Sequence, residues 1–379
     1  MTTKMLVAPF LLLSVLSLPA QEKQPSRLIQ TGTRLFKSLT EPSKSTDGAY
    51  VLRPRLKWTV SADVNSIHTG ADLHSDITIS DFRGDNASII NGTMDLGMSN
   101  RLYTKAGFGI SYAGLGIGYG IEIGKKSGER NTFFTFGSIT SFYGYNIKYY
   151  RTHQNVSGTL DLEGFDPIDL TSKYPGEMRT LSLSGFYAFN RHKFVFASAY
   201  GGRTLQRRSA GSWVVTAKYM QGAFSVDPND VFFTERLNDL HRYSTQQFSL
   251  GGGFAFNWVL LHRDPSDRKK EDGLRNLTLN ATFLPMISLL NHVKTEQGSG
   301  HDRQVVRYVG QPSLSPALLS AVCYSWDRYF VTAQAGYNDF RFQGTETGVE
   351  EDGGRLRTKI RTHGVFYDMS AKIQVGVRF

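Results

Sequence analysis

Three arginines close together in the sequence, Arg203, Arg207 and Arg208, form the most distinctive charged cluster of the chain. Such a cluster is either a solvated surface or part of a polar ladder inside a barrel. Neighbouring residues of a regular strand point to opposite faces, so Arg207 and Arg208 cannot both face one interior. We predict that an inward arginine pairs with a buried acid, for which the candidates are Glu122 and Asp368.

The residue pattern gives little support to catalytic or metal chemistry. Lipid hydrolysis would need a serine, a histidine and an orienting polar group at one rim. The candidates are His241 with Ser244, or His192, and none of them stands in a catalytic motif. The nine histidines lack zinc-ligand spacing, and the acids of residues 153–177 fit no calcium loop. The sequence therefore predicts no catalytic residue, no metal ligand and no cofactor.

The overall composition is typical of a barrel rather than of a helical membrane protein. Charged residues make up 20% of the 379 residues, and the mean hydropathy is −0.30. Glycine (38 residues) and aromatic residues (12%) are abundant in short alternating runs, as in membrane barrels. After the N-terminus, no stretch approaches the ~18 apolar residues of a spanning helix. Cys323 is the one cysteine, which excludes an intrachain disulfide.

The N-terminus has the features of a secretory signal. Residues 1–20 combine a basic start, an apolar core and a small residue, Ala20, after which we predict cleavage. Residues 21–54 follow as a polar periplasmic leader. This leader is either disordered or contains a short amphipathic helix over residues 27–39, where apolar residues fall at helical spacing.

The charge of the chain indicates an anionic partner. The formal net charge is +10. A signal peptide would take the chain away from nucleic acid, so the sequence predicts no nucleic-acid partner. For a secreted bacterial protein, we expect outer-membrane lipid, with lipopolysaccharide phosphate as the natural anion.

The clearest structural signal is the C-terminal segment, residues 365–379. Its odd positions are all apolar, and its even positions are polar or glycine apart from Phe366. A strict period of two over this length predicts a long strand with one apolar face. The chain ends in Phe379, and an aromatic last residue resembles the sorting signal that barrel-assembly machinery recognises in outer-membrane proteins. The alternative is the last strand of a soluble sandwich.

Similar alternation recurs along the chain from about residue 55. In residues 105–124 the apolar parity switches across Ala113-Gly114, as a tight hairpin requires, and the opposite face is almost all glycine. Further hairpins are predicted over residues 131–152, over 179–201 with strands at 179–188 and 193–201, and over 315–342. Other strands are predicted over residues 213–220, 245–258 and 277–290. Polar connections are predicted over residues 74–91, with a paired strand at the end of this segment as an alternative, and over 153–177, 227–242, 291–311 and 343–359.

This pattern predicts an all-β fold, a transmembrane antiparallel up-and-down β-barrel over residues 55–379. We expect about 12 strands, with 10 and 14 as alternatives, because a barrel with both termini in the periplasm has an even number. The alternation between residues 190 and 262 does not give an even count. In that interval the pattern therefore either divides one strand into two or fails to reveal a strand.

Several stretches resemble a known family. Residues 187–194 and 206–212 (YAFNRHKF and QRRSAGS) are similar to the signature of the DUF4421 outer-membrane proteins of Bacteroidetes. The resemblance implies an outer-membrane barrel from such a bacterium and implies no activity. The charged insert at residues 262–273 departs from it, since a shorter turn is expected there. Further similar stretches are residues 105–120 (KAGFGISYAGLGIGYG), 251–259 (GGGFAFNWV) and 324–342 (YSWDRYFVTAQAGYNDFRF).

These observations favour a non-enzymatic outer-membrane barrel with a structural or narrow-channel, porin-like role. The glycine-lined interior and the modest strand number favour a closed or narrow lumen, because barrel diameter grows with strand number. One alternative is a lipid-modifying enzyme. The other is a barrel subunit of a surface complex, with the connections at 153–177, 291–311 and 343–359 as contacts.

Overall fold

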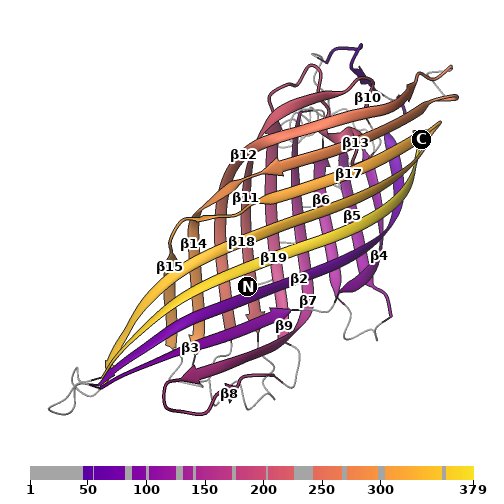
Figure 1. The fold of residues 1–379 in the computed structure, drawn as a ribbon. Helices are drawn as coiled ribbons and strands as arrows, with labels where there is room; N and C mark the ends of the chain where they lie inside the picture. The colour runs from indigo at the N-terminus through magenta and orange to yellow at the C-terminus, as the bar shows by residue number, and fades with distance from the viewer. Residues whose placement is uncertain are drawn as a thin grey trace, which may run out of the picture. The chain divides into compact units, whose positions relative to one another are not determined.

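The computed structural model describes residues 46–53, 55–81, 88–99, 102–124, 131–139, 142–172, 176–201, 204–225, 242–266, 271–297, 304–351 and 356–379. The predicted signal peptide and most of the predicted leader lie outside these residues. Within them there is one short 3₁₀ turn, η2 (Phe196–Ser198), and no helix long and apolar enough to cross a membrane. All other elements are strands (Figure 1): β1 (Val51–Leu52), β2 (Trp58–Asp81), β3 (Ser88–Ser99), β4 (Tyr103–Tyr112), β5 (Leu115–Glu122), β6 (Thr132–Ile139), β7 (Tyr143–Leu162), β8 (Ile168–Asp169), β9 (Gly176–Ala188), β10 (Leu205–Gln206), β11 (Ala210–Ser225), β12 (Arg242–Arg263), β13 (Arg275–Leu284), β14 (Met286–Gln297), β15 (Gln304–Gly310), β16 (Ser313–Leu314), β17 (Ala317–Trp326), β18 (Tyr329–Glu351) and β19 (Leu356–Arg378).

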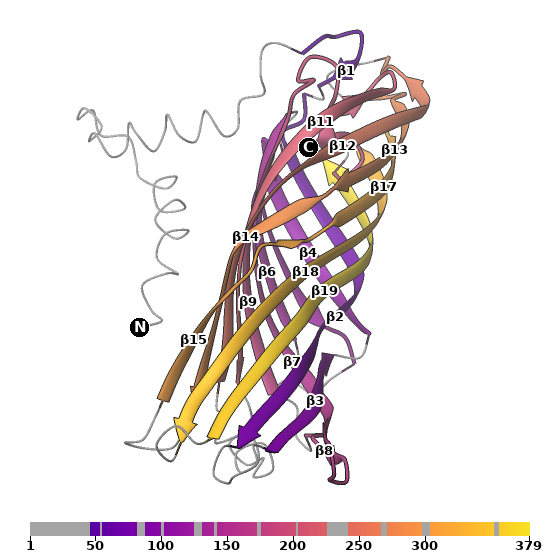
Figure 2. The same cartoon turned by 60° about the vertical axis from the view of Figure 1, so that its left-hand side comes forward.

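The last long strand closes the barrel on the first. β19 pairs antiparallel with β2 along its whole length. Beyond β19, the backbone N–H groups of Trp58 and Phe379 each donate to the other residue's carbonyl oxygen, both at 3.0 Å. All neighbouring strands of the barrel pair antiparallel, and Figure 2 shows them crossing its wall obliquely. The predicted all-β up-and-down barrel is confirmed.

The number of strands around the ring changes along the barrel. At the end where β2 begins and β19 ends, twelve strands surround the lumen: β2, β4, β5, β6, β7, β9, β11, β12, β13, β17, β18 and β19. Further along, β3 alone pairs with both β2 and β7 in place of β4, β5 and β6, and β14 pairs with β12 in place of β13. The reason is the shortness of β4, β5 and β6, which have ten, eight and eight residues and do not reach the other end. The predicted number of twelve is confirmed for the wider ring.

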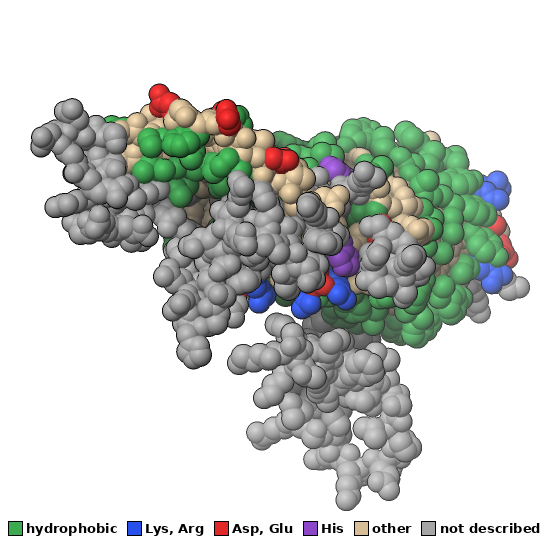
Figure 3. Space-filling model, turned by 90° about the horizontal axis from the view of Figure 1, so that it is seen from below, with side chains coloured by type: hydrophobic (Ala, Val, Ile, Leu, Met, Phe, Trp, Pro, Cys, Tyr) green, Lys and Arg blue, Asp and Glu red, His purple; other side chains and the backbone are tan. Residues whose placement is uncertain are grey.

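Side chains alternate between the two faces of the wall as the sequence predicts. On β19, Met369, Ile373 and Val375 are exposed on the outside, while Asp368 and Lys372 line the interior. Other strands expose apolar side chains in the same way, and Figure 3 shows them covering much of the outer face. Examples are Trp58, Val64, Phe108, Ile110, Trp213, Val215, Phe254, Trp258, Phe283 and Leu318.

The glycine-rich hairpin is formed by β4 and β5. Ala113 (φ 48°) and Gly114 (φ 96°) form its two-residue turn, which requires positive φ at both positions. Tyr112 pairs with Leu115, as predicted. Its glycines face the interior, where a Cβ on Gly107 would lie 2.8 Å from Asp63 Oδ1. The glycines therefore make room for polar side chains of the neighbouring strand.

Four of the predicted polar connections are largely strand, which corrects the sequence analysis. β2 continues to Asp81, β7 to Leu162, β14 to Gln297 and β18 to Glu351. These extensions carry polar residues on both faces, so they lack the alternation that marks the apolar part of each strand. Their pairing comes from long-range contacts instead; for example, the hydroxyls of Ser75 and Thr362 hydrogen-bond at 3.0 Å across β2 and β19. Of the fifth connection, residues 226–241 lie outside the described residues.

The predicted strand at residues 193–201 is wrong. This segment follows β9 and folds into the barrel instead of joining its wall, with η2 at its centre. Phe194, Val195, Phe196 and Ala197 are all buried, so the segment is apolar on every side and not on alternate residues. We call residues 194–201 the plug. Once residues 193–201 are no longer counted as a strand, the number of strands predicted between residues 190 and 262 is even.

Candidate functional site

A cavity of about 460 Å³ lies inside the barrel. We call it the chamber. Its lining includes Phe196 and Tyr200 of the plug. It also includes Met220, Phe340 and Phe366, which belong to a cluster of buried apolar side chains that we call the apolar layer. The chamber thus lies between the plug and the apolar layer. The apolar layer consists of Ala71, Met98, Val156, Met220, Phe224, Val293, Phe340 and Phe366.

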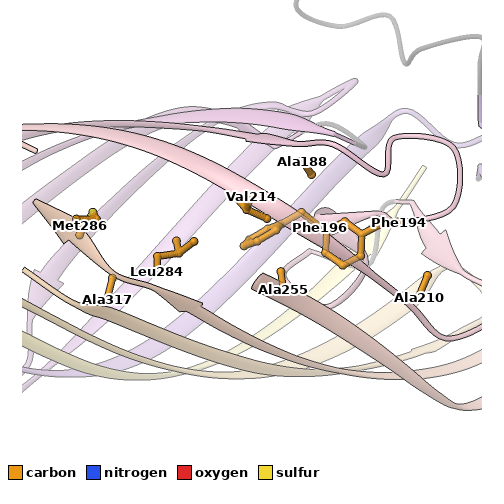
Figure 4. Close-up of a cluster of buried hydrophobic side chains, with 9 residues drawn as sticks. All are labelled: Ala188, Phe194, Phe196, Ala210, Val214, Ala255, Leu284, Met286 and Ala317. Carbon is orange, nitrogen blue, oxygen red and sulfur yellow. The ribbon is translucent and has the colours of Figure 1, made fainter. Parts of the chain in front are cut away.

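Aromatic stacking packs the plug against the barrel wall. The Phe196 ring lies 4.5 Å from that of Phe186 on β9 and stacks on Tyr200 at 5.1 Å with an interplanar angle of 9°. Figure 4 shows Phe194 and Phe196 beside Val214 and Ala255 of the wall. Aromatic contacts of this kind add to the free energy of burial, so the plug is an integral part of the core.

Polar side chains of the wall bind the backbone of the plug. Asn257 on β12 donates from Nδ2 to the Val195 carbonyl at 2.7 Å and to Ser198 Oγ at 3.1 Å. Gln334 on β18 donates to the Tyr200 carbonyl at 3.0 Å. These bonds satisfy carbonyls that a folded-in segment would otherwise bury without partners.

The Tyr200 hydroxyl adds a further link to the wall. It donates to Asn280 Oδ1 on β13 at 2.9 Å. Burial raises the pKa of Tyr200, so the phenol remains protonated and able to donate. The end of the plug is therefore fixed by both its ring and its hydroxyl.

Four lysines face the chamber from four strands: Lys105 on β4, Lys148 on β7, Lys218 on β11 and Lys372 on β19. Only two acids, Asp63 and Asp368, stand among the same lining residues. The chamber therefore carries an excess of positive charge.

Aromatic and amide groups contact three of these lysines. Lys218 Nζ lies 3.9 Å from the ring centroid of Phe340, and Lys105 Nζ lies 4.6 Å from that of Phe133. Lys372 Nζ donates to Gln374 Oε1 at 3.2 Å. These contacts orient the ammonium groups without neutralising them.

Unlike the chamber lysines, several arginines of the barrel are paired with carboxylates. Arg151 pairs with Glu177 at 2.6 Å, and Arg378 pairs with Glu271 at 2.9 Å. Between the four lysines and the carboxylates of the described residues, by contrast, there is no ion pair within 4.0 Å. Thus no carboxylate of the described residues forms a contact that neutralises the excess positive charge of the chamber.

The predicted arginine cluster lies at the rim and not in the chamber. Arg207 donates to Asp264 Oδ1 at 2.6 Å and to the Gly48 carbonyl, and Arg208 lies over the ring of Tyr50. Arg203 lies outside the described residues. Arg207 lies after the plug in the sequence, at a point where the chain is again at the rim. The structure therefore does not bring it to Glu122 or Asp368.

The two predicted acids take separate positions. Glu122 at the end of β5 pairs in register with Lys105 and accepts a hydrogen bond from the Asn131 backbone at 3.1 Å. Asp368 lines the chamber. Of the described members of the predicted charge cluster, only Asp368 therefore belongs to this site. Phe379 lies at the barrel closure, and its role as a sorting signal stays a prediction.

Of the two histidines considered for catalysis, the structure describes only His192, which lies exposed in the turn between β9 and the plug. His241 lies outside the described residues, and Ser244 donates to the Lys294 carbonyl at 3.4 Å. Cys323 is buried near Ser325. Among the described residues, there is no group of three histidines, cysteines or acids that could hold a metal ion.

The four chamber lysines and the amides that bind the plug are not among the residues predicted from the sequence. A signal for the lysines existed. Each lies at the polar parity of an otherwise apolar alternation, as Lys372 does between Ala371 and Ile373. Asn257 lies at the same polar parity between Phe256 and Trp258, and Gln334 between Ala333 and Ala335. Their partner could not be predicted, because the plug has the pattern of a strand.

Comparison with solved structures finds barrels of low similarity. The outer membrane protease OmpT from Escherichia coli has 9% sequence identity and a TM-score of 0.32, with 85% of this chain and 97% of that chain covered. A FadL homologue from Pseudomonas aeruginosa has 10% identity and a TM-score of 0.20, with 84% and 90% covered. The toluene transporter TodX from P. putida has 7% identity and a TM-score of 0.19, with 83% and 90% covered. No curated protein matches the chain.

Comparison with protein families gives one assignment. The domain of unknown function DUF4421 matches residues 49–266, from just before β1 to just beyond β12. This match spans more than half of the 379 residues. It includes the plug, the wall residue Asn257 and three of the four chamber lysines. The chain therefore belongs to the DUF4421 family, a family defined by a domain of unknown function.

Proposed function

We propose that the protein is a non-enzymatic outer-membrane barrel that forms a narrow channel, closed at rest by the plug. The observation that carries this proposal is the way the plug is held. The side chains of Asn257 and Gln334 in the wall bind the backbone of the plug. The Tyr200 hydroxyl of the plug binds the wall residue Asn280. A narrow barrel filled in this way has no open aqueous path, whereas a wide porin leaves one.

The outer surface supports a location in the outer membrane. Apolar side chains point outward around the barrel, and the ring of twelve strands closes through the pairing of β2 with β19, so these strands present no open edge to lipid. The predicted signal peptide, residues 1–20, supports export. We propose that the plug end faces the periplasm, because the N-terminal end of β2 and the C-terminal end of β19 lie there.

Two partners follow from this location. We propose that barrel-assembly machinery recognises β19 and Phe379, whose aromatic ring is exposed. We also propose that lipopolysaccharide phosphate contacts exposed basic residues near the opposite end, such as Arg242 of β12 and Arg361 of β19. Both partners are expectations from charge and position.

Single-channel recording in a planar bilayer tests the channel. We expect the folded wild-type barrel to be silent apart from rare brief openings. The Asn257→Ala variant removes two hydrogen bonds to the plug, so we expect resolvable current steps from it. Asn291→Ala is the control, since Asn291 is also a buried wall asparagine but binds Ser288 and Gln311 instead of the plug.

The outcomes separate three kinds of barrel. Steady current from the wild type would mean an open pore and would contradict the plug. Silence from wild type and Asn257→Ala alike, with both shown to be folded and inserted, would contradict the channel and leave a structural barrel. Steps from Asn257→Ala but not from Asn291→Ala would support a gated lumen.

A further inference from the structure

We propose that the chamber is a binding site for a small organic dianion that carries a phosphate or two carboxylates. This inference rests on the closed lumen proposed above, because an open pore would fill the chamber with exchanging water and salt. The charge, spacing and lining of the chamber support it in three steps.

The first step concerns charge. Lys105, Lys148, Lys218 and Lys372 face the chamber, against Asp63 and Asp368, which leaves two positive charges in excess. Burying a charge is costly unless the charge is paired. Since no carboxylate among the described residues forms an ion pair with these lysines, a dianion would neutralise the excess. Lysine ammonium groups bind phosphate and carboxylate through strong charge-assisted hydrogen bonds.

The second step concerns spacing. Lys105 and Lys372 are both paired in register with Asn65, so they flank one position of β2. Lys148 and Lys218 lie on either side of β9, next to Ser182 and Ser184. Lys105 also lies within electrostatic reach of Lys148. Four mutually repelling cations that converge on one space are arranged for an anion between them.

The third step concerns the organic part of the ligand. The volume of about 460 Å³ falls within the range of small-molecule sites. Most of the large apolar side chains that line the chamber are aromatic, and they offer flat surfaces beside the charged groups. We therefore infer an organic anion with an apolar or ring-shaped body rather than a bare inorganic ion. The aromatic side chains of the lining include Phe133, Phe186, Phe196, Tyr200 and Phe340.

Isothermal titration of the folded barrel in detergent with phenyl phosphate tests the site. We expect saturable binding of one phenyl phosphate per chain to the wild type. Lys372→Met should weaken binding about 10- to 100-fold, the effect of one lost charge-assisted contact. Lys359→Met is the matched control, since it removes an exposed lysine from the same strand, and it should bind as the wild type does. Inorganic phosphate should bind more weakly, and uncharged benzyl alcohol should not bind.

The same titration is carried out on Asn257→Ala, in which the plug is loosened. In this variant, slow entry of phenyl phosphate into the chamber does not limit the binding that is measured. An absence of saturable binding in both wild type and Asn257→Ala would overturn the proposal. Equal affinity of Lys372→Met and Lys359→Met would overturn it as well, because binding would then lie elsewhere. Phenyl phosphate binding by a barrel that shows no current in any variant would leave the site intact and contradict only the channel.

Discussion

Arg378, the last residue of β19, donates a hydrogen bond from Nε to Glu271 Oε2 at 2.9 Å, and neither side chain is more than 2% exposed. Arg378 also donates from Nη2 to the Asp327 carbonyl at 2.7 Å. The pair thus joins the end of the chain to the connection between β12 and β13 and to the turn between β17 and β18. It ties three parts of the plug-end rim together.

Replacement of Arg378 by methionine should strongly destabilise the barrel. Arg378→Met leaves the Glu271 carboxylate buried without its cation, and a broken buried pair typically costs about 3–5 kcal/mol. The measurement is urea-induced unfolding in lipid vesicles, followed by tryptophan fluorescence. The double variant Arg378→Met/Glu271→Met should recover most of the loss. An unfolding midpoint for Arg378→Met equal to that of the wild type would argue against the pair.

The ion pair of Arg207 with Asp264 should give a stability that depends on pH. Burial alone would raise the pKa of Asp264, but hydrogen bonds from His262 and Arg207 outweigh it and hold that pKa below its ordinary value of 3.8. The carboxylate is thus more stable in the folded protein than in the unfolded chain. Its contribution is fully present above pH 3.8 and is lost as the pH falls through the lower folded value.

We therefore expect Asp264→Asn to be less stable than the wild type at neutral pH. The difference should be small, at most about 1 kcal/mol, because Asp264 is half exposed and its charge is screened. Unfolding midpoints across an acid titration provide the check. The two proteins should converge as the pH falls below 3.8, and a gap that stays constant throughout would contradict the assignment.

Two glycines should respond very differently to an added methyl group. A Cβ on Gly253 would lie 1.9 Å from the backbone oxygen of Phe283, whereas the nearest atom to a Cβ on Gly185 lies 3.7 Å away. Backbone cannot give way as a flexible side chain can, so Gly253→Ala should cost about 1–3 kcal/mol. Gly185→Ala should stay within about 0.5 kcal/mol of the wild type. Equal unfolding midpoints for the two variants would show that the strands β12 and β13 separate freely.

Loss of the Tyr200 hydroxyl should loosen the plug without removing its stacked ring. Tyr200→Phe deletes the 2.9 Å hydrogen bond to Asn280, which is worth about 1 kcal/mol. Brief openings in planar bilayers should then become about fivefold more frequent, the factor that corresponds to this free energy. Tyr187→Phe is the control, because Tyr187 lies on β9 outside the plug. An unchanged opening frequency would mean that the plug does not gate the lumen.

The barrel itself could be read from the sequence because its signal is local. A period of two marks which residues of a strand face lipid, as at Met369, Ile373 and Val375 of β19, and a parity switch marks the tight turn at Ala113-Gly114. These features depend on neighbours within a few residues. The sequence alone therefore determined the fold class, the glycine-lined inner face of β4 and β5, and the closing role of the last strand.

Other features depend on contacts between residues far apart in the sequence, and only the tertiary structure decided them. Strand extensions with two polar faces carry no alternation, so their partners alone define them. The plug has strand-like composition, but Asn257 and Asn280 hold it inside the lumen. Lys105 and Lys372 are 267 positions apart in the sequence, and each looks like an ordinary polar residue there. They share one chamber because closure of β19 on β2 brings the two ends of the barrel together.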